Sequence, residues 1–419
     1  MIESALGARE SADRGLRILF ISPYLPSLIR VRPYNLIKAL AERGHQITLL
    51  ALEPPGDDTS GLEGLRTWCQ CVQTVPLPRW RTLWNGVCAL PGQIPFQAAY
   101  SRSPQMLAVI QQTQAEAHFD IAHVEHLRGA ELSRALNGIP VVFDSVDSIT
   151  LLFERARQFG PTRRSRLMAG LDVDRTRRYE ARLLERYARV LVTSPQDKEA
   201  LARLSTGKGL DSRLVVLPNG VDLHYFSPLD LPRDPTTIIF SGKMSYHANI
   251  AAALDLAGQV MPRVWAHRPD ARLIIAGKDP SPELLALTAD PRISVTGTVP
   301  DLRPYLAQAT VSVSPIRYSV GIQNKLLEAM AMATPVVSTP QATAALQAEP
   351  GRDLLVADTP QAIAERVITL LADDTLRQQI GRGGRRYVET YHNWSTAAEK
   401  LEGVYREVMC EPGPGTISR

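Results

Sequence analysis

Long apolar runs are missing from this chain of 419 residues. No stretch reaches about 18 uninterrupted apolar residues, the length that a membrane-spanning helix needs, so we predict none. The N-terminal segment is polar and lacks the apolar core of a secretory signal peptide. Only four cysteines occur, and the C-x-C pair of Cys69 and Cys71 has no second ligand pair at zinc spacing. We therefore expect reduced cysteines in a cytoplasmic protein. Such a protein would be in solution or bound peripherally to the cytoplasmic face of the membrane.

A strong charge of either sign is absent as well. The net charge is +4 and the isoelectric point is about 8.9. This balance is too weak to indicate nucleic-acid binding; it fits an anionic substrate or a membrane surface, or merely a general use of arginine. No acidic D-x-D pair follows a predicted strand, where it would mark a metal site for a diphosphate. The first predicted strand does not lead into G-x-G-x-x-G, which disfavours a nucleotide-dependent dehydrogenase.

Apolar runs and helical patterns alternate along the first half of the chain. The run at 17–22 (RILFIS) is followed by a Pro-containing loop, a helical pattern that ends at Gly44, and the run ITLLAL at 47–52. Strands that are apolar throughout are typical of a parallel sheet with both faces covered. Four more strands are expected at 121–124, 141–144, 189–194 and 214–218.

A second series of the same kind begins at residue 237. Its apolar runs each end in a Gly or Pro turn, and helices are expected at 249–266, 281–289, 301–308, 323–333 and 360–372. We predict the α/β class with two Rossmann-like, doubly wound domains, whose strand ends share a central cleft where ligands bind. The expected parts are a disordered tail (1–15), a first domain (16–226), a second domain (227–393, starting with the linker 227–235) and a helix that packs back on the first domain (394–409).

The segment 314–337, SPIRYSVGIQNKLLEAMAMATPVV, is the densest candidate site. A predicted strand ends at Pro315, and a loop leads into a helix that contains Lys325 and Glu328. Free N–H groups at a helix start hold phosphate oxygens, Lys325 would add a point charge, and Glu328 would accept hydrogen bonds from two ribose hydroxyls. An ordinary amphipathic helix with a solvated Lys and Glu explains the same residues equally well.

Several motifs resemble the retaining glycosyltransferases of family 4. They are PNGVD, GKMSYHAN, LIIAGKDP, VTGTVPDL, GIQNKLLEAMAMATPVV and the N-terminal SPYLPSLIRVRPYNLIKALAERGHQITLL. The resemblance runs from Arg17 to Tyr405 and is nearest to the bacterial branch that makes exopolysaccharides and surface glycans. It implies the GT-B fold, an acceptor-binding first domain and a donor-binding second domain. It also implies a retaining, metal-independent hexosyl transfer from a UDP- or GDP-sugar to a glycan or lipid-linked acceptor, without a cofactor.

The resemblance also assigns roles to residues. Glu328 matches the ribose ligand, and Lys243 and Lys325 match the cations on the diphosphate. Glu125 and His126 lie near the position of a family H-x-H motif and are further catalytic candidates, with a plain surface turn as the alternative. The remaining donor-binding candidates are Gly242, Gly277, Lys278, Thr298, Val299, Pro300, Arg317, Gly321, Ile322, Gln323 and Asn324. The acceptor-binding candidates are Arg30, Arg32, Asp144 and Asp147, of which the two aspartates serve equally well as loop caps.

Two positions depart from the family pattern. Val320 stands where the first of two glutamates is usual, and a second cation after Lys243 is replaced by a stretch with Tyr246, His247 and Asn249. These differences leave the sugar open. They also leave open a non-catalytic relative that only binds nucleotide-sugar, and a sugar-nucleotide epimerase on the same fold.

The segment 76–102 mixes tryptophans with arginines. Trp80 and Trp84 alternate with basic residues, a combination that suits a membrane interface and would bring a lipid-linked acceptor within reach. An excursion of the first domain packed on itself is the alternative. The Arg-rich helical stretch 155–189 is interpreted as a solvated face, with a lipid-binding patch as the alternative.

Overall fold

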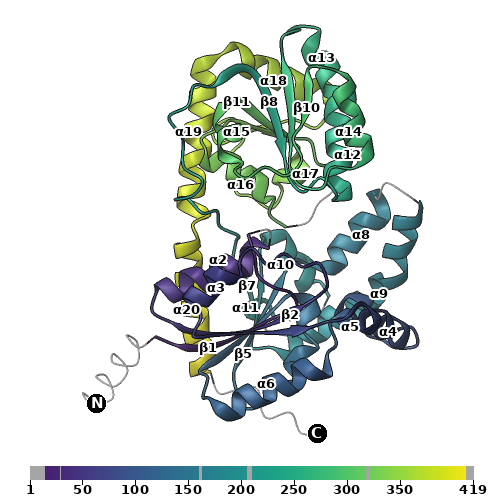
Figure 1. Ribbon diagram of the computed structural model, residues 1–419, viewed down its shortest axis with the longest axis vertical. Coiled ribbons are helices and arrows are strands. Elements are labelled where there is room, and N and C mark those ends of the chain that lie inside the picture. The colour runs from purple at the N-terminus through teal and green to yellow at the C-terminus, as the bar shows by residue number, and fades with distance from the viewer. Residues whose placement is uncertain (1–14, 29, 160–162, 205–209, 318–320, 412–419) are drawn as a thin grey trace.

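The computed structural model describes residues 15–28, 30–159, 163–204, 210–317 and 321–411, which form two α/β domains, one above the other in Figure 1. Each domain contains one parallel sheet. In spatial order the first sheet comprises β3 (Cys71–Pro76), β2 (Gln46–Glu53), β1 (Arg17–Ser22), β4 (Ile121–Glu125), β5 (Val141–Val146), β6 (Arg189–Val192) and β7 (Leu214–Val216). The second comprises β10 (Ile293–Val295), β9 (Arg272–Ala276), β8 (Asp234–Ser241), β11 (Ala309–Ser314), β12 (Val336–Ser338) and β13 (Leu355–Val356).

Helices cover both faces of each sheet. The first domain has α2 (Val31–Glu42), α3 (Leu62–Trp68), α4 (Arg79–Ala89), α5 (Phe96–Tyr100), α6 (Pro104–Glu116), α7 (His126–Gly129), η1 (Leu132–Ala135), α8 (Ile149–Phe159), α9 (Arg163–Arg186), α10 (Pro195–Ala202) and α11 (Leu210–Arg213). The second has α12 (His247–Asp255), η2 (Leu256–Val260), α13 (Met261–Trp265), α14 (Pro282–Ala286), η3 (Leu287–Ala289), α15 (Arg303–Gln308), α16 (Asn324–Ala331), α17 (Pro340–Thr343), α18 (Pro360–Ala372) and α19 (Asp374–Tyr391).

Strand β1 shows why the strands are apolar throughout. Ile18 and Phe20 enter the core on one face of the sheet, and Leu19 and Ile21 enter the core on the other. All four side chains are fully buried, and burying each contributes about 1.5–3 kcal/mol. In both sheets the strand order reverses beside the first strand, between β1 and β4 and between β8 and β11. Open α/β sheets bind ligands at such positions.

The chain passes between the domains twice. Helix α19 packs on the second domain, and α20 (Trp394–Cys410) returns to the first domain against α2, as the yellow helices in Figure 1 show. Trp394, Leu401 and Tyr405 of α20 belong to the first-domain core. The two passages are bonded to each other, since the Val221 amide donates to the His392 carbonyl at 2.8 Å.

Some elements differ from the expected ones. The helix expected at 249–266 is interrupted by the π-helical turn η2, because Pro262 has no N–H to donate to the preceding turn. Strand β8 begins inside the expected linker, where Asp234 pairs with Ala309 of β11. Helix α19 was not anticipated, because its glycines lower helix propensity; a side chain at Gly383, however, would overlap the Arg352 carbonyl, so close packing requires glycine there.

The described helices include none whose length and apolarity would let it cross a membrane.

Candidate functional site

Strained backbone gathers at the carboxyl ends of the central strands. His126 follows β4 with a φ of +62°, and Val146 ends β5 with a φ of +67°. Left-handed conformations are uncommon for histidine and disfavoured for a β-branched valine. In the second domain, Gly242 after β8 and Gly277 after β9 have φ of +147° and +150°. Glycine adopts such angles without strain, so the strain lies at His126 and Val146. Because strain concentrates at functional sites, these strand ends mark the candidate site.

Lys325 is fixed at the start of α16 by a buried asparagine. Its Nζ donates to Asn249 Oδ1 at 2.6 Å, and Asn249 Nδ2 donates to the Lys243 carbonyl at 2.9 Å. Burial lowers the pKa of Lys325 to about 8, an effect that Glu328 partly offsets. In the described part of the chain this ammonium has no ion-pair partner. A bound anion would therefore find an oriented and poorly solvated positive charge.

Glu328 lies one turn further along α16. Burial raises the pKa of its carboxyl to about 7, and Lys325 opposes that shift. Within the described ranges no group donates a hydrogen bond to this half-buried carboxylate. Its oxygens are therefore free to accept hydrogen bonds from hydroxyl groups of a ligand.

Two glycines make room for the Lys325 side chain. A Cβ at Gly242 would lie 2.9 Å from Asn249 Nδ2 and 3.1 Å from Lys325 Cε. A Cβ at Gly277 would overlap the Gly242 carbonyl. A larger residue at either position would displace the pair that orients the ammonium.

The other donor-binding candidates are spread around this centre. Arg317 is turned away into an ion pair with Asp255 at 3.0 Å, and the Ile322 side chain is part of the second-domain core. Val320 lies outside the described residues. On the loops after β8, β9 and β10, the exposed residues are Lys243, Lys278, Thr298 and Pro300, and Val299 is half-buried. Gln323, just before α16, and Asn324, its first residue, are half-buried as well.

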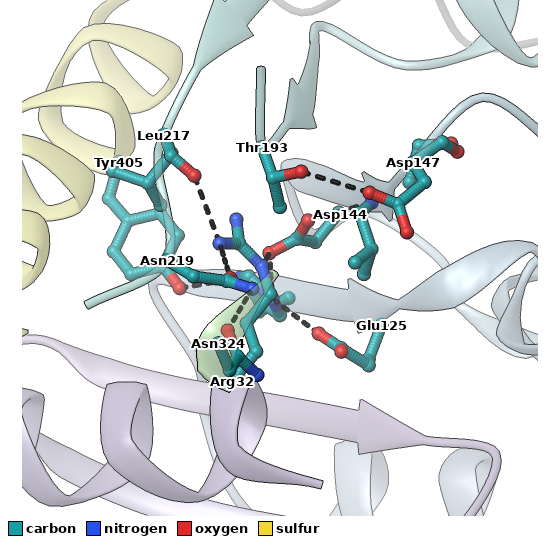
Figure 2. A network of polar contacts seen from close by, with 12 residues as sticks. Arg32, Glu125, Asp144, Asp147, Thr193, Leu217, Asn219, Asn324 and Tyr405 are labelled. Carbon is teal, nitrogen blue, oxygen red and sulfur yellow. Dashed lines mark hydrogen bonds and ion pairs between the residues drawn. The ribbon is translucent and has the colours of Figure 1, made fainter. Parts of the chain in front are cut away.

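A buried polar network centred on Arg32 occupies the first-domain side (Figure 2). Arg32 Nε donates to Asp144 Oδ2 at 2.8 Å. Its Nη1 donates to the Leu217 carbonyl and to Asn219 Oδ1, both at 2.9 Å. Asn219 Nδ2 in turn donates to Asn324 Oδ1 of α16 at 3.3 Å. The network therefore reaches from the first-domain core to α16 of the other domain.

Tyrosines close this network on two sides. The Tyr24 hydroxyl donates to Glu125 Oε1 at 3.1 Å, and the Tyr405 hydroxyl bonds His123 Nδ1 at 2.8 Å. Burial raises the pKa of Glu125, and neighbouring Asp144 adds to the rise. Ligand atoms of His123, Glu125 and Asp144 lie within 4.8 Å of one another. In this cluster Asp144 is paired with the Arg32 guanidinium, whereas His123 Nε2 and Glu125 Oε2 have no hydrogen-bond partner among the described residues.

Burial changes the interpretation of three predicted site residues. Glu125 and Asp144 are 0% exposed and Arg32 is 4% exposed. Each of these side chains bonds protein groups beneath the cleft. Among the described residues, Arg32 Nη2 and Glu125 Oε2 have no hydrogen-bond partner.

Asp147 does face the second domain. Thr193 donates to its Oδ1 at 2.9 Å, and burial, with Asp197 nearby, raises the pKa of Asp147 to about 7. A Cβ on Gly321 would overlap the Asp147 carboxylate. The loop before α16 therefore rests directly on this aspartate.

His126 lies among aromatic and basic groups. Its ring meets the Tyr24 ring edge-on, with centroids 6.1 Å apart. The Arg30 guanidinium stacks over the same Tyr24 ring, 4.2 Å from its centroid, and forms an ion pair with Asp57 at 2.6 Å. Burial lowers the pKa of His126 to about 3, helped by the charges of Arg128 and Arg30. The imidazole is therefore neutral at pH 7, and since its Nδ1 accepts the backbone N–H of Arg128 at 3.2 Å, its proton is on Nε2.

Sequence reasoning missed four residues that shape the site. Asn249 and Asn219 were noted only as parts of motifs, although their bonds to Lys325 and Arg32 organise the two halves. Tyr24 and Arg128 carried no signal except their position just after predicted strands.

Both halves of the chain match families of glycosyltransferases. Residues 30–225 match the family described as Glycosyltransferase Family 4, and residues 235–373 match Glycosyl transferases group 1. A phosphatidyl-myo-inositol mannosyltransferase of Mycobacterium leprae is 24% identical over 94% of this chain and 97% of its own length. A GDP-mannose-dependent monoacylated alpha-(1-6)-phosphatidylinositol monomannoside mannosyltransferase of Corynebacterium glutamicum is 27% identical over 49% of this chain and 59% of its own length.

Solved structures share the arrangement of both domains. Sucrose-phosphate synthase of Thermosynechococcus elongatus superposes with a TM-score of 0.69 at 19% identity, covering 94% of this chain and 99% of that one. HepE of Anabaena, solved with UDP and glucose, superposes with a TM-score of 0.65 at 15% identity, covering 93% and 99%. At these identities the likeness establishes the fold.

The fold and the family matches define this chain as a GT-B glycosyltransferase. Its first domain matches the family 4 model and its second matches the group 1 model, and both matches lie within the stretch from Arg17 to Tyr405 that the motifs indicated.

Proposed function

We propose that this protein transfers a hexose from a nucleotide diphosphate-sugar to a glycan or lipid-linked acceptor, with retention of configuration and without a metal, in the synthesis of a bacterial surface glycan. The observation that carries the proposal is the Lys325–Asn249 pair beside Gly242, since it presents an oriented cation at the start of a helix. That arrangement suits a diphosphate leaving group.

In this proposal each half of the cleft has one task. Lys325, the exposed Lys243 and the amides that begin α16 stabilise charge on the departing diphosphate, while Glu328 binds the ribose. On the first-domain side, neutral His126 offers its Nε2–H to a hydroxyl of the sugar. Asp147 supports the loop at Gly321 against the donor.

The acceptor side of the proposal includes a membrane surface. Helix α4 exposes Trp80, Leu83, Trp84 and Val87 at 64%, 72%, 58% and 57%. Soluble proteins rarely leave such a row of large apolar side chains in water, and Arg79 lies beside it. The mannosyltransferase relatives are named for lipid acceptors based on phosphatidylinositol. A peripheral contact through α4 would bring such an acceptor to the cleft.

A binding protein without turnover, or an epimerase, would use the same donor site. Release of nucleoside diphosphate distinguishes these functions. The protein is incubated with UDP-glucose or GDP-mannose, and slow donor hydrolysis is followed with and without a lipid extract as acceptor. Transfer is expected to consume the donor and to label the extract. Tight donor binding without release would establish the binding protein, and a new sugar still attached to the nucleotide would establish the epimerase.

A further inference from the structure

We infer that Arg128, together with Arg30, forms a subsite for a phosphate group of the acceptor, at the edge of the cleft that faces α4. This inference rests on the proposed function and adds the chemical class of the acceptor to it.

Arg128 is half-buried; burial lowers the pKa of its guanidinium, and nearby Asp57 partly offsets that shift without forming an ion pair. Its Nε is buried and has no hydrogen-bond partner among the described residues, and no carboxylate in that part of the chain forms an ion pair with it. The guanidinium stacks on the Tyr100 ring at 5.2 Å. Leaving a buried donor and a charge without partners costs free energy unless a ligand supplies an acceptor.

The surroundings favour an anion over other ligands. Arg30 adds a second guanidinium, 33% exposed, whose only ion pair in the described chain is with Asp57. Two guanidinium groups, one of them free, fit the planar and bidentate recognition of a phosphate.

The position of Arg128 connects the cleft to α4. Arg128 follows His126 by two residues in α7, at the carboxyl end of β4, and α7 packs on α5. Its stacking partner Tyr100 ends α5, and Asn85 of α4 donates to the Tyr100 carbonyl at 3.1 Å. A phosphate at Arg128 would therefore lie between the sugar-transfer site and the surface proposed to meet the membrane. An acceptor with a lipid on one side of the phosphate and a hydroxyl-bearing headgroup on the other fits that order.

Binding of small phosphates tests the subsite directly. Calorimetry in the presence of UDP or GDP compares glycerol 3-phosphate with glycerol for the wild-type protein, Arg128→Gln, Arg128→Lys and the exposed control Arg203→Gln. We expect the wild type and the control to bind glycerol 3-phosphate but not glycerol. Arg128→Gln is expected to weaken that binding by about tenfold or more, with partial recovery in Arg128→Lys. Equal affinity in wild type and Arg128→Gln, or no preference of the wild type for the phosphate, would overturn the inference.

Vesicles separate a lipid phosphate from a free one. Transfer is measured with vesicles of phosphatidylcholine and phosphatidylinositol in equal parts, and with soluble myo-inositol 1-phosphate. If the phosphate belongs to a lipid, Trp80→Ala/Trp84→Ala lowers transfer to the vesicles and leaves glycerol 3-phosphate affinity unchanged. If it is free, the soluble acceptor is used and the double variant matches wild type. UDP or GDP affinity is measured in every variant. If the wild type binds neither nucleotide, the proposed function fails. If it binds nucleotide but Arg128→Gln does not change glycerol 3-phosphate affinity, the subsite alone fails.

Discussion

Gly321 joins the two halves of the site through its lack of a side chain. It has a φ of +65° and lies against the Asp147 carboxylate. Gly321→Ala is therefore expected to push the loop before α16 off the first domain and to lower transfer strongly. Gly351 provides a matched control, because its φ is +86° and a Cβ there meets nothing within 4 Å. Its alanine variant keeps activity and loses about 1 kcal/mol of stability. Equal activities of the two variants would contradict the assignment.

Substitution of Glu328 is the most direct test of ribose binding. Replacement by alanine removes charge-assisted hydrogen bonds to a ligand but breaks none within the described protein. Nucleoside diphosphate affinity is expected to fall by about 1.5–3 kcal/mol, while the free energy of unfolding changes little. Titration calorimetry of Glu328→Ala beside the exposed control Glu365→Ala measures this. Unchanged affinity would remove Glu328 from the donor site.

At the scale of elements, α16 carries two groups whose pKa values flank neutrality. The charge of Lys325 is lost as pH rises through about 8, and the charge of Glu328 is lost as pH falls through about 7. Nucleoside diphosphate affinity is therefore expected to be highest between these values and to fall on both sides. Lys325→Arg tests the alkaline side, because arginine stays protonated throughout. Wild-type affinity that stays constant well above pH 8 would show that Lys325 does not carry the interaction.

Helix α4 is the second element with a measurable task. Trp80→Ala/Trp84→Ala removes both aromatic side chains of this helix. The double variant is expected to reduce flotation with vesicles of phosphatidylcholine and phosphatidylglycerol, because interfacial aromatics supply the apolar burial. Leu285→Ala, on the second domain and 48% exposed in the wild type, is the control for general stickiness. Attraction by Arg79 and its neighbours should weaken at high salt. Flotation of the double variant at the wild-type level would exclude α4 as the contact.

At the scale of the whole molecule, α20 stabilises a domain other than the one that precedes it. Tyr405 is fully buried, and its hydroxyl bonds His123 Nδ1. Tyr405→Phe leaves that nitrogen without a partner and is expected to lower the free energy of unfolding by about 1–3 kcal/mol. Denaturant titration compares it with Tyr391→Phe, whose wild-type ring is 56% exposed. An equal midpoint for both variants would contradict a stabilising role.

The two α/β domains could be predicted from the sequence because their strands produce a local pattern. Apolar runs that end in Gly or Pro indicate buried parallel strands. Helix α16 was predicted for the same reason, and Lys325 and Glu328 lie one turn apart on it. The contacts that orient these groups were not predictable. Asn249 and Lys325 are 76 residues apart, and Arg32 and Asp144 are 112 apart. Only packing brings them together, and it also buries Arg32 and Glu125, which sequence reasoning had placed in contact with substrates.

The pairing of the two interdomain passages limits how the molecule can move. Val221 and Asn393 form a β-bridge, and His392 bonds the Asn219 carbonyl at 2.7 Å. We expect two linked crossings to act as a hinge, which permits the domains to close on each other but resists sliding and twisting. A nucleotide bound to one domain and an acceptor bound to the other would each favour the closed conformation. By thermodynamic reciprocity, we expect each substrate to bind more tightly when the other is already in place.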